Sequence, residues 1–521
     1  MPAERSDVHI FGFADFVPAL AILIVILTMT DIRYRFRVSV APIPILGIAY
    51  STAAIVGLSL LVMEFLYALG WRVPVFLSNP SVVQFWLGLW FFLSIFLWIS
   101  YAFIWQLSTF RVSNAKKIYR QVESAIVRGS DSELPTIAME LVRSAGRFIK
   151  LSKLPQQAFQ NSKRGLRMNA GDYAYNLLYI LGNRKFCHHV ARSSYALAIV
   201  IFSEMTRQKK YDLPVNDFAL NVFTEALINE DSILYRENVD YPYGKGLIGN
   251  LRPFTQSLFS DFDLITVLAG QGPSPFDVSY KVVSIWTSKQ LEIYSGCLLN
   301  FSKAFFEKIV KEKWVFNSAA YYRGLQVLES SSRDLSKINN FSEDYWVSEQ
   351  YKKFDAAVKF IKYTFELFNA QKDFPENALR NKSEKNRDIY DHLSSLMYDL
   401  IWAASWVTEP FNKCWSIQYG TVFDAFFQGY GDVSHPVKIV RHRLRRLIYD
   451  EINGPATSQN YKSVRFIGYC LNVDGLSLIS KDQLKQRCDY DFYPLHKTIL
   501  SWVKKNFLNC INIILSWLSC V

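Results

Sequence analysis

The sequence predicts an all-α protein, in which a unit of three transmembrane helices precedes a large helical region outside the membrane. Three long apolar segments lie within the first 107 residues, helical periodicity dominates the remainder, and the alternation typical of β-strands is sparse. Half of the 521 residues are hydrophobic and 16% are aromatic. This composition supplies enough apolar material for a core and disfavours extensive disorder.

The apolar segments span residues 10–30, 44–69 and 82–107. Each supplies the roughly 20 apolar residues that a helix needs to cross about 30 Å of hydrocarbon. Helices buried in soluble proteins are seldom so long and so free of charge, so we expect membrane insertion. The second segment carries Ala49, Ala53 and Gly57 at four-residue spacing, a stripe small enough for close helix contact.

The charges that flank these segments predict the topology. Arg33, Arg35 and Arg37 lie between the first two segments and further cations follow the third, whereas the link 70–81 holds only Arg72. Because basic residues concentrate on the cytoplasmic side, we expect a multi-pass inner-membrane protein with its N-terminus outside and its body in the cytoplasm. The first apolar run has no small-residue cleavage site after it, which favours a retained anchor.

Three polar side chains, Asp15, Glu64 and Gln84, lie near the predicted outer ends of the apolar segments. Carboxylates inside membrane helices tend to face a bundle interior or water. One interpretation is an acidic ring that attracts cations when several copies form a homo-oligomer around a pore. The other is a pair of carboxylates that stay hydrated near the interface.

From residue 114 onward, apolar residues recur at intervals of three and four. Paired helices of this length suggest an α-solenoid or an irregular bundle, although no repeat of fixed period is found. Composition shifts near residues 240 and 380 predict domain boundaries. We therefore expect a transmembrane unit at 1–113 and helical subdomains at 114–240, 241–380 and 381–521, the last of them basic.

A glycine-rich motif is the weak candidate for a nucleotide-binding loop. Gly244, Gly246 and Gly249 fit the pattern G-x-G-x-x-G, which in a dinucleotide site lets the backbone approach a pyrophosphate. Here a loop precedes the motif instead of a buried strand, and no βαβ pattern surrounds it. A surface turn is the better interpretation.

Neither a metal nor a cofactor is expected. The seven cysteines are scattered without a C-x-x-C pair, a pattern typical of a reduced compartment. Cys187, His188 and His189 are adjacent, and side chains about 100° apart on a helix do not converge on one ion. Because no catalytic signature occurs, the protein is expected not to be an enzyme.

The most basic stretch of the C-terminal part is a predicted helix at 435–449. Its apolar stripe would leave five cations outward: Lys438, Arg441, Arg443, Arg445 and Arg446. With a net charge of +12 for the chain, this face could bind nucleic-acid phosphates or anionic lipid. The alternative is a solvated face that pairs with acidic neighbours such as Asp450 and Glu451.

Few membrane helices joined to a large, basic, helical region resemble the membrane effectors of bacterial antiphage systems, including the transmembrane effectors of retrons. The likeness is architectural and comes from residues 10–107 and 441–446. It implies that the cytosolic part senses a nucleic-acid, nucleoprotein or protein partner. On release, the membrane part would oligomerise and breach the inner membrane. The alternatives are a membrane scaffold that recruits a cytosolic partner, and a membrane-tethered enzyme that uses the Gly244 loop or the paired histidines.

Overall fold

The computed structural model describes residues 11–29, 31–69, 80–100, 109–152, 168–238, 252–340, 344–371, 373–375, 387–407, 416–427 and 434–452. Regular secondary structure in these residues is entirely helical, which confirms the predicted all-α class. The chain divides into two compact units, unit 1 at Met1–Phe218 and unit 2 at Ala219–Val521. Each unit is described by itself, and the sequence-based boundaries near 113, 240 and 380 stay predictions.

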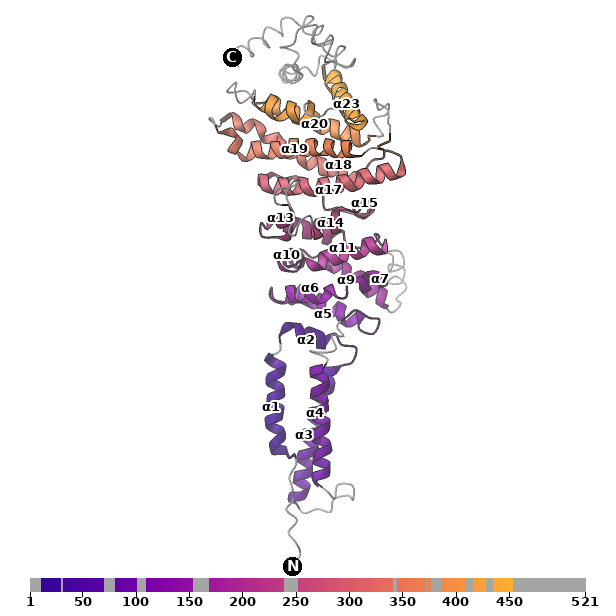
Figure 1. Ribbon diagram of the computed structural model, residues 1–521. Helices are drawn as coiled ribbons and strands as arrows, with labels where there is room; N and C mark the ends of the chain where they lie inside the picture. Colours follow the sequence, from indigo (N-terminus) through magenta and orange to yellow (C-terminus); the bar gives the residue numbers. More distant parts are fainter. Residues whose placement is uncertain are drawn as a thin grey trace, which may run out of the picture. The chain divides into compact units, whose positions relative to one another are not determined.

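Three helices of unit 1 correspond to the predicted apolar segments: α1 (Phe13–Met29), α3 (Ile45–Ala68) and α4 (Pro80–Ile99) (Figure 1). Two of them are long and apolar enough to cross a membrane, over Ile45–Leu66 and Ser81–Ile99. At 1.5 Å per residue these spans reach about 33 and about 28 Å. The apolar part of α1 is shorter, so the described structure holds two candidate spans where the sequence predicted three.

The outward faces of α3 and α4 are apolar. Only 39% of one span and 28% of the other are buried, whereas the core helix of a soluble protein is mostly buried. Bulky side chains fill the exposed faces, among them Leu58, Phe65, Trp86 and Phe96. Such large contiguous apolar surfaces are typical of membrane or protein contact.

Helices α1, α3 and α4 pack around a shared cluster of buried side chains that includes Phe16. The ring of Phe16 on α1 is buried against Phe91 of α4, with 5.2 Å between ring centroids, and against Gly57 of α3. A Cβ at Gly57 would lie 2.6 Å from a ring carbon of Phe16. Ala49 and Ala53 are also buried, which confirms the predicted packing stripe.

The remainder of unit 1 consists of shorter helices. One of them, α2, lies between α1 and α3 in the sequence, and the others come after α4. Helix α2 (Ile32–Ser39) packs against α3, α5 and α6 (Figure 1). Helix α5 buries Ile118, Val122 and Ile126, the residues that periodicity predicted. The others are α5 (Ala115–Arg128), α6 (Glu133–Val142), α7 (Ala145–Leu151), α9 (Ala170–Leu181), α10 (Arg184–Ser193) and α11 (Ala196–Gln208), while α12 (Asn216–Ile228) crosses the unit boundary.

Unit 2 is built around two long helices, α17 (Ser288–Glu312) and α19 (Glu349–Ala370), joined by stacked rings such as Phe306 on Phe368 at 4.4 Å. Helix α18 (Ala319–Ser332) packs on α20 (Ile389–Ser405), which packs on α23 (His435–Ile452). The other elements are α13 (Ile233–Asn238), α14 (Pro253–Phe259), α15 (Phe262–Gln271), α16 (Tyr280–Ser284), η3 (Arg333–Asn340), η4 (Tyr345–Val347), η6 (Ser416–Phe423) and α22 (Asp424–Phe427).

Candidate functional site

A buried carboxylate joins α2, the helix between the apolar helices α1 and α3, to the helices that follow. Glu140 lies on the buried face of α6 and is 2% exposed. Arg37 of α2 donates from Nη2 to Oε1 at 2.8 Å and from Nε to Oε2 at 2.9 Å, and Arg33 donates from Nε to Oε1 at 2.5 Å. The arginines are four residues apart, so both lie on one face of α2. We call Arg33, Arg37 and Glu140 the α2–α6 clamp.

The clamp is an ionised group held in a buried place. Burial disfavours the charged form of Glu140, but hydrogen bonds from Arg37 and Arg33 outweigh it and lower the pKa of this carboxyl. The hydrogen bond to Glu140 in turn raises the pKa of Arg37, whose side chain is also buried. Since an unpaired buried charge is costly, α2 is not free to leave α6.

The link between α2 and α3 is fixed by a second contact. Lys117 of α5 donates from Nζ to the backbone oxygens of Ala41 at 2.7 Å and Pro42 at 3.1 Å. These carbonyl groups lie just beyond the C-terminal end of α2. The Lys117 ammonium group therefore donates hydrogen bonds to backbone oxygens beyond the last helical turn. Both ends of the segment between the apolar helices α1 and α3 are therefore attached to the helices α5 and α6.

Residues 109 and 110 are attached to the start of α7. The backbone N–H of Phe110 donates to Ser144 Oγ at 3.0 Å, and Arg147 Nη1 donates to Thr109 Oγ1 at 2.8 Å. Asn114 completes the turn by donating to the Thr109 carbonyl. A movement of α6 and α7 would therefore reach α3 through α2 and would also reach residues 109–114.

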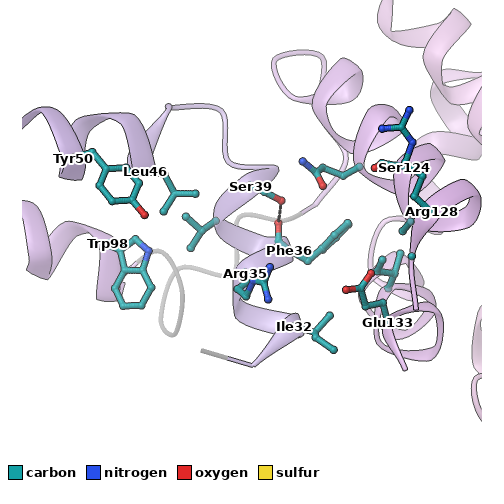
Figure 2. Close-up of a pocket in the computed structure, with 15 residues that line it drawn as sticks. Ile32, Arg35, Phe36, Ser39, Leu46, Tyr50, Trp98, Ser124, Arg128 and Glu133 are labelled. Carbon is teal, nitrogen blue, oxygen red and sulfur yellow. Dashed lines mark hydrogen bonds between the residues drawn. The ribbon is translucent and has the colours of Figure 1, made fainter. Parts of the chain in front are cut away.

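The predicted basic collar is thus divided between two roles. Arg33 and Arg37 belong to the clamp, whereas the exposed Arg35 lines a cavity of about 640 Å³ beside it (Figure 2). Sequence reasoning did not find Glu140. The available signal was a lone carboxylate next to Leu141 and three residues after Ile137, on the apolar face of α6.

At the opposite end of the apolar helices α1, α3 and α4, two of the three predicted polar residues meet at the start of α1. Glu64 Oε1 accepts from the N–H of Phe13 at 2.7 Å, and Asp15 Oδ2 accepts from the N–H of Gly12 at 3.1 Å. They satisfy amides that a helix start leaves without partners. Gln84 is buried on α4. The acidic ring stays a prediction, and helix capping gives both carboxylates another role.

One predicted placement on the basic helix is wrong. Arg443 is 5% exposed, not outward, and pairs with Asp388 and with Asp391 at 3.0 Å. These aspartates form the capping box of α20, and the Arg443 guanidinium also lies over the Tyr390 ring at 5.3 Å. The sequence pattern missed this because the partners come from α20, about 55 residues earlier in the chain.

The other cations of α23 show a mixed pattern. Arg441 Nε donates to the Phe426 carbonyl at 2.8 Å and its guanidinium lies 5.9 Å from the ring of Phe365. Arg445 and Arg446 are partly buried, and Lys438 is exposed. A polyanion-binding role for this helix stays a prediction, with Lys438 its most accessible member.

The glycine motif at Gly244, Gly246 and Gly249 lies outside the described residues. Near it, Glu237 is fully buried and accepts from the N–H groups of Phe254 and Thr255, each at 2.8 Å. These amides begin α14, so the Glu237 carboxylate satisfies two of the donors that a helix start leaves without partners. Burial raises the pKa of Glu237 against these hydrogen bonds.

The cysteine and the two histidines of α10 do not converge. The buried Cys187 thiol donates to the Leu181 carbonyl, His188 is exposed, and His189 Nε2 lies 3.7 Å from Asp131. Across the described part of the chain, no group of three His, Cys, Asp or Glu side chains could hold a metal ion.

Unit 2 contains a smaller cavity of about 210 Å³, lined by Glu329, His392 and Asp399 among others. Burial, assisted by the charge of Glu329, raises the pKa of Asp399 to about 7. Burial lowers the pKa of His392, whose Nε2 lies 3.1 Å from Asn317 Oδ1. Sequence reasoning missed Asp399, because its burial depends on the packing of α18 against α20.

The fold and the clamp define a class: a helical protein with two helices able to span a membrane, whose link helix is fixed to the body by a buried ion pair. No protein-family model matches the chain, and no curated protein matches it either.

Proposed function

We propose that this chain is an integral membrane protein in which the body of unit 1 controls the packing of the membrane helices through α2. The clamp is the observation that carries the proposal. Helix α2 begins three residues after the end of α1 and ends six residues before α3. A displacement of α6 that pulls on Glu140 would therefore act directly on both helices.

In this proposal α1, α3 and α4 all lie in the inner membrane, with the N-terminus outside. The apolar outward faces of α3 and α4 support the insertion. Helix α1 has 17 residues, about 26 Å, a length that a slightly thinned bilayer accommodates at modest cost. Because α2 carries three arginines and packs on the body, the positive-inside rule assigns the body to the cytoplasm.

The membrane helices are the effector part in this proposal. In the packed state, Phe16 fills the space over Gly57 and holds α1 to α3. A change in the body, caused by a nucleic-acid, nucleoprotein or protein partner, would separate these helices and permit oligomerisation and leakage. The architectural resemblance to antiphage membrane effectors gives this activity its context. The Asp15 and Glu64 carboxylates at the start of α1 would then be released to face water.

The test is the membrane potential of cells that express the full chain, measured with a potential-sensitive dye. We expect depolarisation, and at equal protein level we expect more of it with Glu140→Gln, because that change breaks the clamp. Asp15→Asn combined with Glu64→Gln should also alter the leak, whereas the exposed Asp131→Asn should not. An unchanged potential, in cells where membrane insertion is verified, would refute the effector function and leave the scaffold alternative.

A further inference from the structure

The cavity beside the clamp lies at the level where the membrane spans end. Its lining includes Leu46 and Tyr50 from the first two turns of α3 and Trp98 from the last turn of α4. The spans end at Ile45 and Ile99, so Leu46 and Trp98 are each one residue inside a span. In the membrane placement proposed above, the cavity therefore opens where hydrocarbon gives way to headgroups.

The two ends of the cavity differ in chemistry. Figure 2 shows Trp98 and Tyr50 at one end, Arg128 and Ser124 at the other, and Arg35 between them. One end is therefore aromatic and apolar, whereas the charged side chains Arg35, Arg128 and Glu133 lie away from it, among apolar ones such as Phe36 and Ile32. A phospholipid has the same division, with acyl chains on one side of its phosphate and the headgroup on the other.

The cations of this cavity are available to a ligand. Arg33 and Arg37 are engaged by Glu140, but the exposed guanidinium groups of Arg35 and Arg128 make no ion pair or hydrogen bond with any residue that the structure describes. With the carboxylate of Glu133 in the same lining, two cations face one anion, so one positive charge remains. This positive charge favours an anionic ligand. Arginine binds phosphate well because its planar guanidinium group can donate two parallel hydrogen bonds to phosphate oxygens.

A buried donor also lacks an acceptor here. Trp98 is 2% exposed, and its indole Nε1–H has no hydrogen-bond partner within the described ranges. A buried N–H left without an acceptor costs about 1–3 kcal/mol, and buried indoles usually find one. A phosphate or ester oxygen that enters between the ends of the spans and α2 would supply that acceptor after a small side-chain shift.

We propose that this cavity binds the phosphodiester headgroup of an anionic phospholipid, with Arg35 and Arg128 as the phosphate ligands. A lipid suits the site better than a free phosphate, because its acyl chains continue along the exposed apolar faces of α3 and α4. The inference rests on the membrane placement in the proposed function and deepens it. A headgroup in contact with α2 would make the state of the clamp depend on lipid composition.

The test uses the purified full chain in a neutral detergent, titrated with short-chain phosphatidylglycerol, with the thermal midpoint as the readout. We expect a saturable rise for the wild type and an affinity at least about tenfold weaker for Arg35→Gln with Arg128→Gln, as the loss of a charge-assisted hydrogen bond implies. The matched control is Lys116→Gln with Arg120→Gln, which removes two exposed cations of α5 that do not line the cavity. The control should bind like the wild type.

Three outcomes would overturn the inference. Equal weakening in both double variants would mean general charge attraction. Equal shifts with phosphatidylcholine would mean that the anionic headgroup is not recognised, and an equal shift with inorganic phosphate would mean that the lipid part contributes nothing. Failure of the proposed function is measured in a different experiment, extraction from isolated membranes. A chain that leaves the membrane fraction without detergent is not inserted in the bilayer, whatever it binds in the lipid titration.

Discussion

Replacing Glu140 by Gln tests the clamp most sharply within the fold. The change keeps the size of the side chain and removes its charge, so the buried Arg37 loses the carboxylate with which it pairs. Removing one partner of a buried ion pair costs about 3–5 kcal/mol. At about 2–4 °C per kcal/mol for a unit of this size, the thermal midpoint in detergent should fall by about 6–20 °C.

Two further variants separate this effect from a general loss of charge. Asp131→Asn breaks the pair with Lys185, whose side chains are 75% and 48% exposed, and should leave the midpoint nearly unchanged because water screens that pair. Glu140→Leu combined with Arg37→Leu removes both buried charges and should recover much of the loss. If Glu140→Gln shifts the midpoint no more than Asp131→Asn does, the clamp does not hold α2 on α6.

The pH dependence of the same pair follows from the lowered pKa of Glu140. The ionised Glu140 stabilises the fold at pH values above 4.5, the ordinary pKa of this carboxyl. This stabilisation is lost as the pH falls through the lower pKa that Glu140 has in the folded protein. The difference in midpoint between wild type and Glu140→Gln should therefore be constant at neutral pH and shrink below about pH 4.5. A difference that grows on acidification would contradict this assignment.

Three more changes test other contacts. Gly57→Ala places a Cβ against the Phe16 ring of α1 and should lower the free energy of unfolding by about 1–3 kcal/mol. Gly47→Ala should cost nothing, because its Cβ would meet its nearest atom at 3.8 Å. Equal effects of the two changes on thermal unfolding would refute the close contact between Phe16 and Gly57. Because burial raises the pKa of Asp399 from 3.8 to about 7, folding is penalised as the pH rises between these two values, so Asp399→Asn should raise the thermal midpoint at pH 8 and lose that advantage gradually as the pH falls from about 7 towards 3.8. Arg443→Gln should destabilise unit 2 because it removes the cation that pairs with Asp388 and Asp391 of α20, and Lys438→Gln should not, as measured by thermal unfolding. A larger loss of stability for Lys438→Gln than for Arg443→Gln would contradict the buried position of Arg443.

Local signals predicted much of the fold. The spacing of Ile118, Val122 and Ile126 is sufficient to define the buried face of α5, and the stripe through Gly57 identified the helix contact in the apolar unit. The expected first segment, 10–30, was too long, because Gly12 and the capping carboxylates begin α1 at Phe13. Capping by Glu64 comes from another helix, so no local pattern announces it.

The candidate sites depended on contacts between distant parts of the chain. Glu140 lies more than 100 residues from its arginines, and nothing in the sequence around Arg37 distinguishes a buried ion pair from a topological signal. Arg443 was misplaced for the same reason, since helical periodicity gives the apolar face but not the acidic groups on a neighbouring helix. The cavity beside the clamp could not be predicted from the sequence, because its lining comes from helices that are far apart in the chain, among them α2, α4 and α5.

Extraction of the full chain from isolated membranes tests the central claim most directly. We expect the protein to stay in the membrane pellet after washing with alkaline carbonate and high salt, and to enter the supernatant only with detergent. Recovery as an unaggregated protein in the detergent-free supernatant would contradict it, and the apolar faces of α3 and α4 would then need a protein partner instead of lipid.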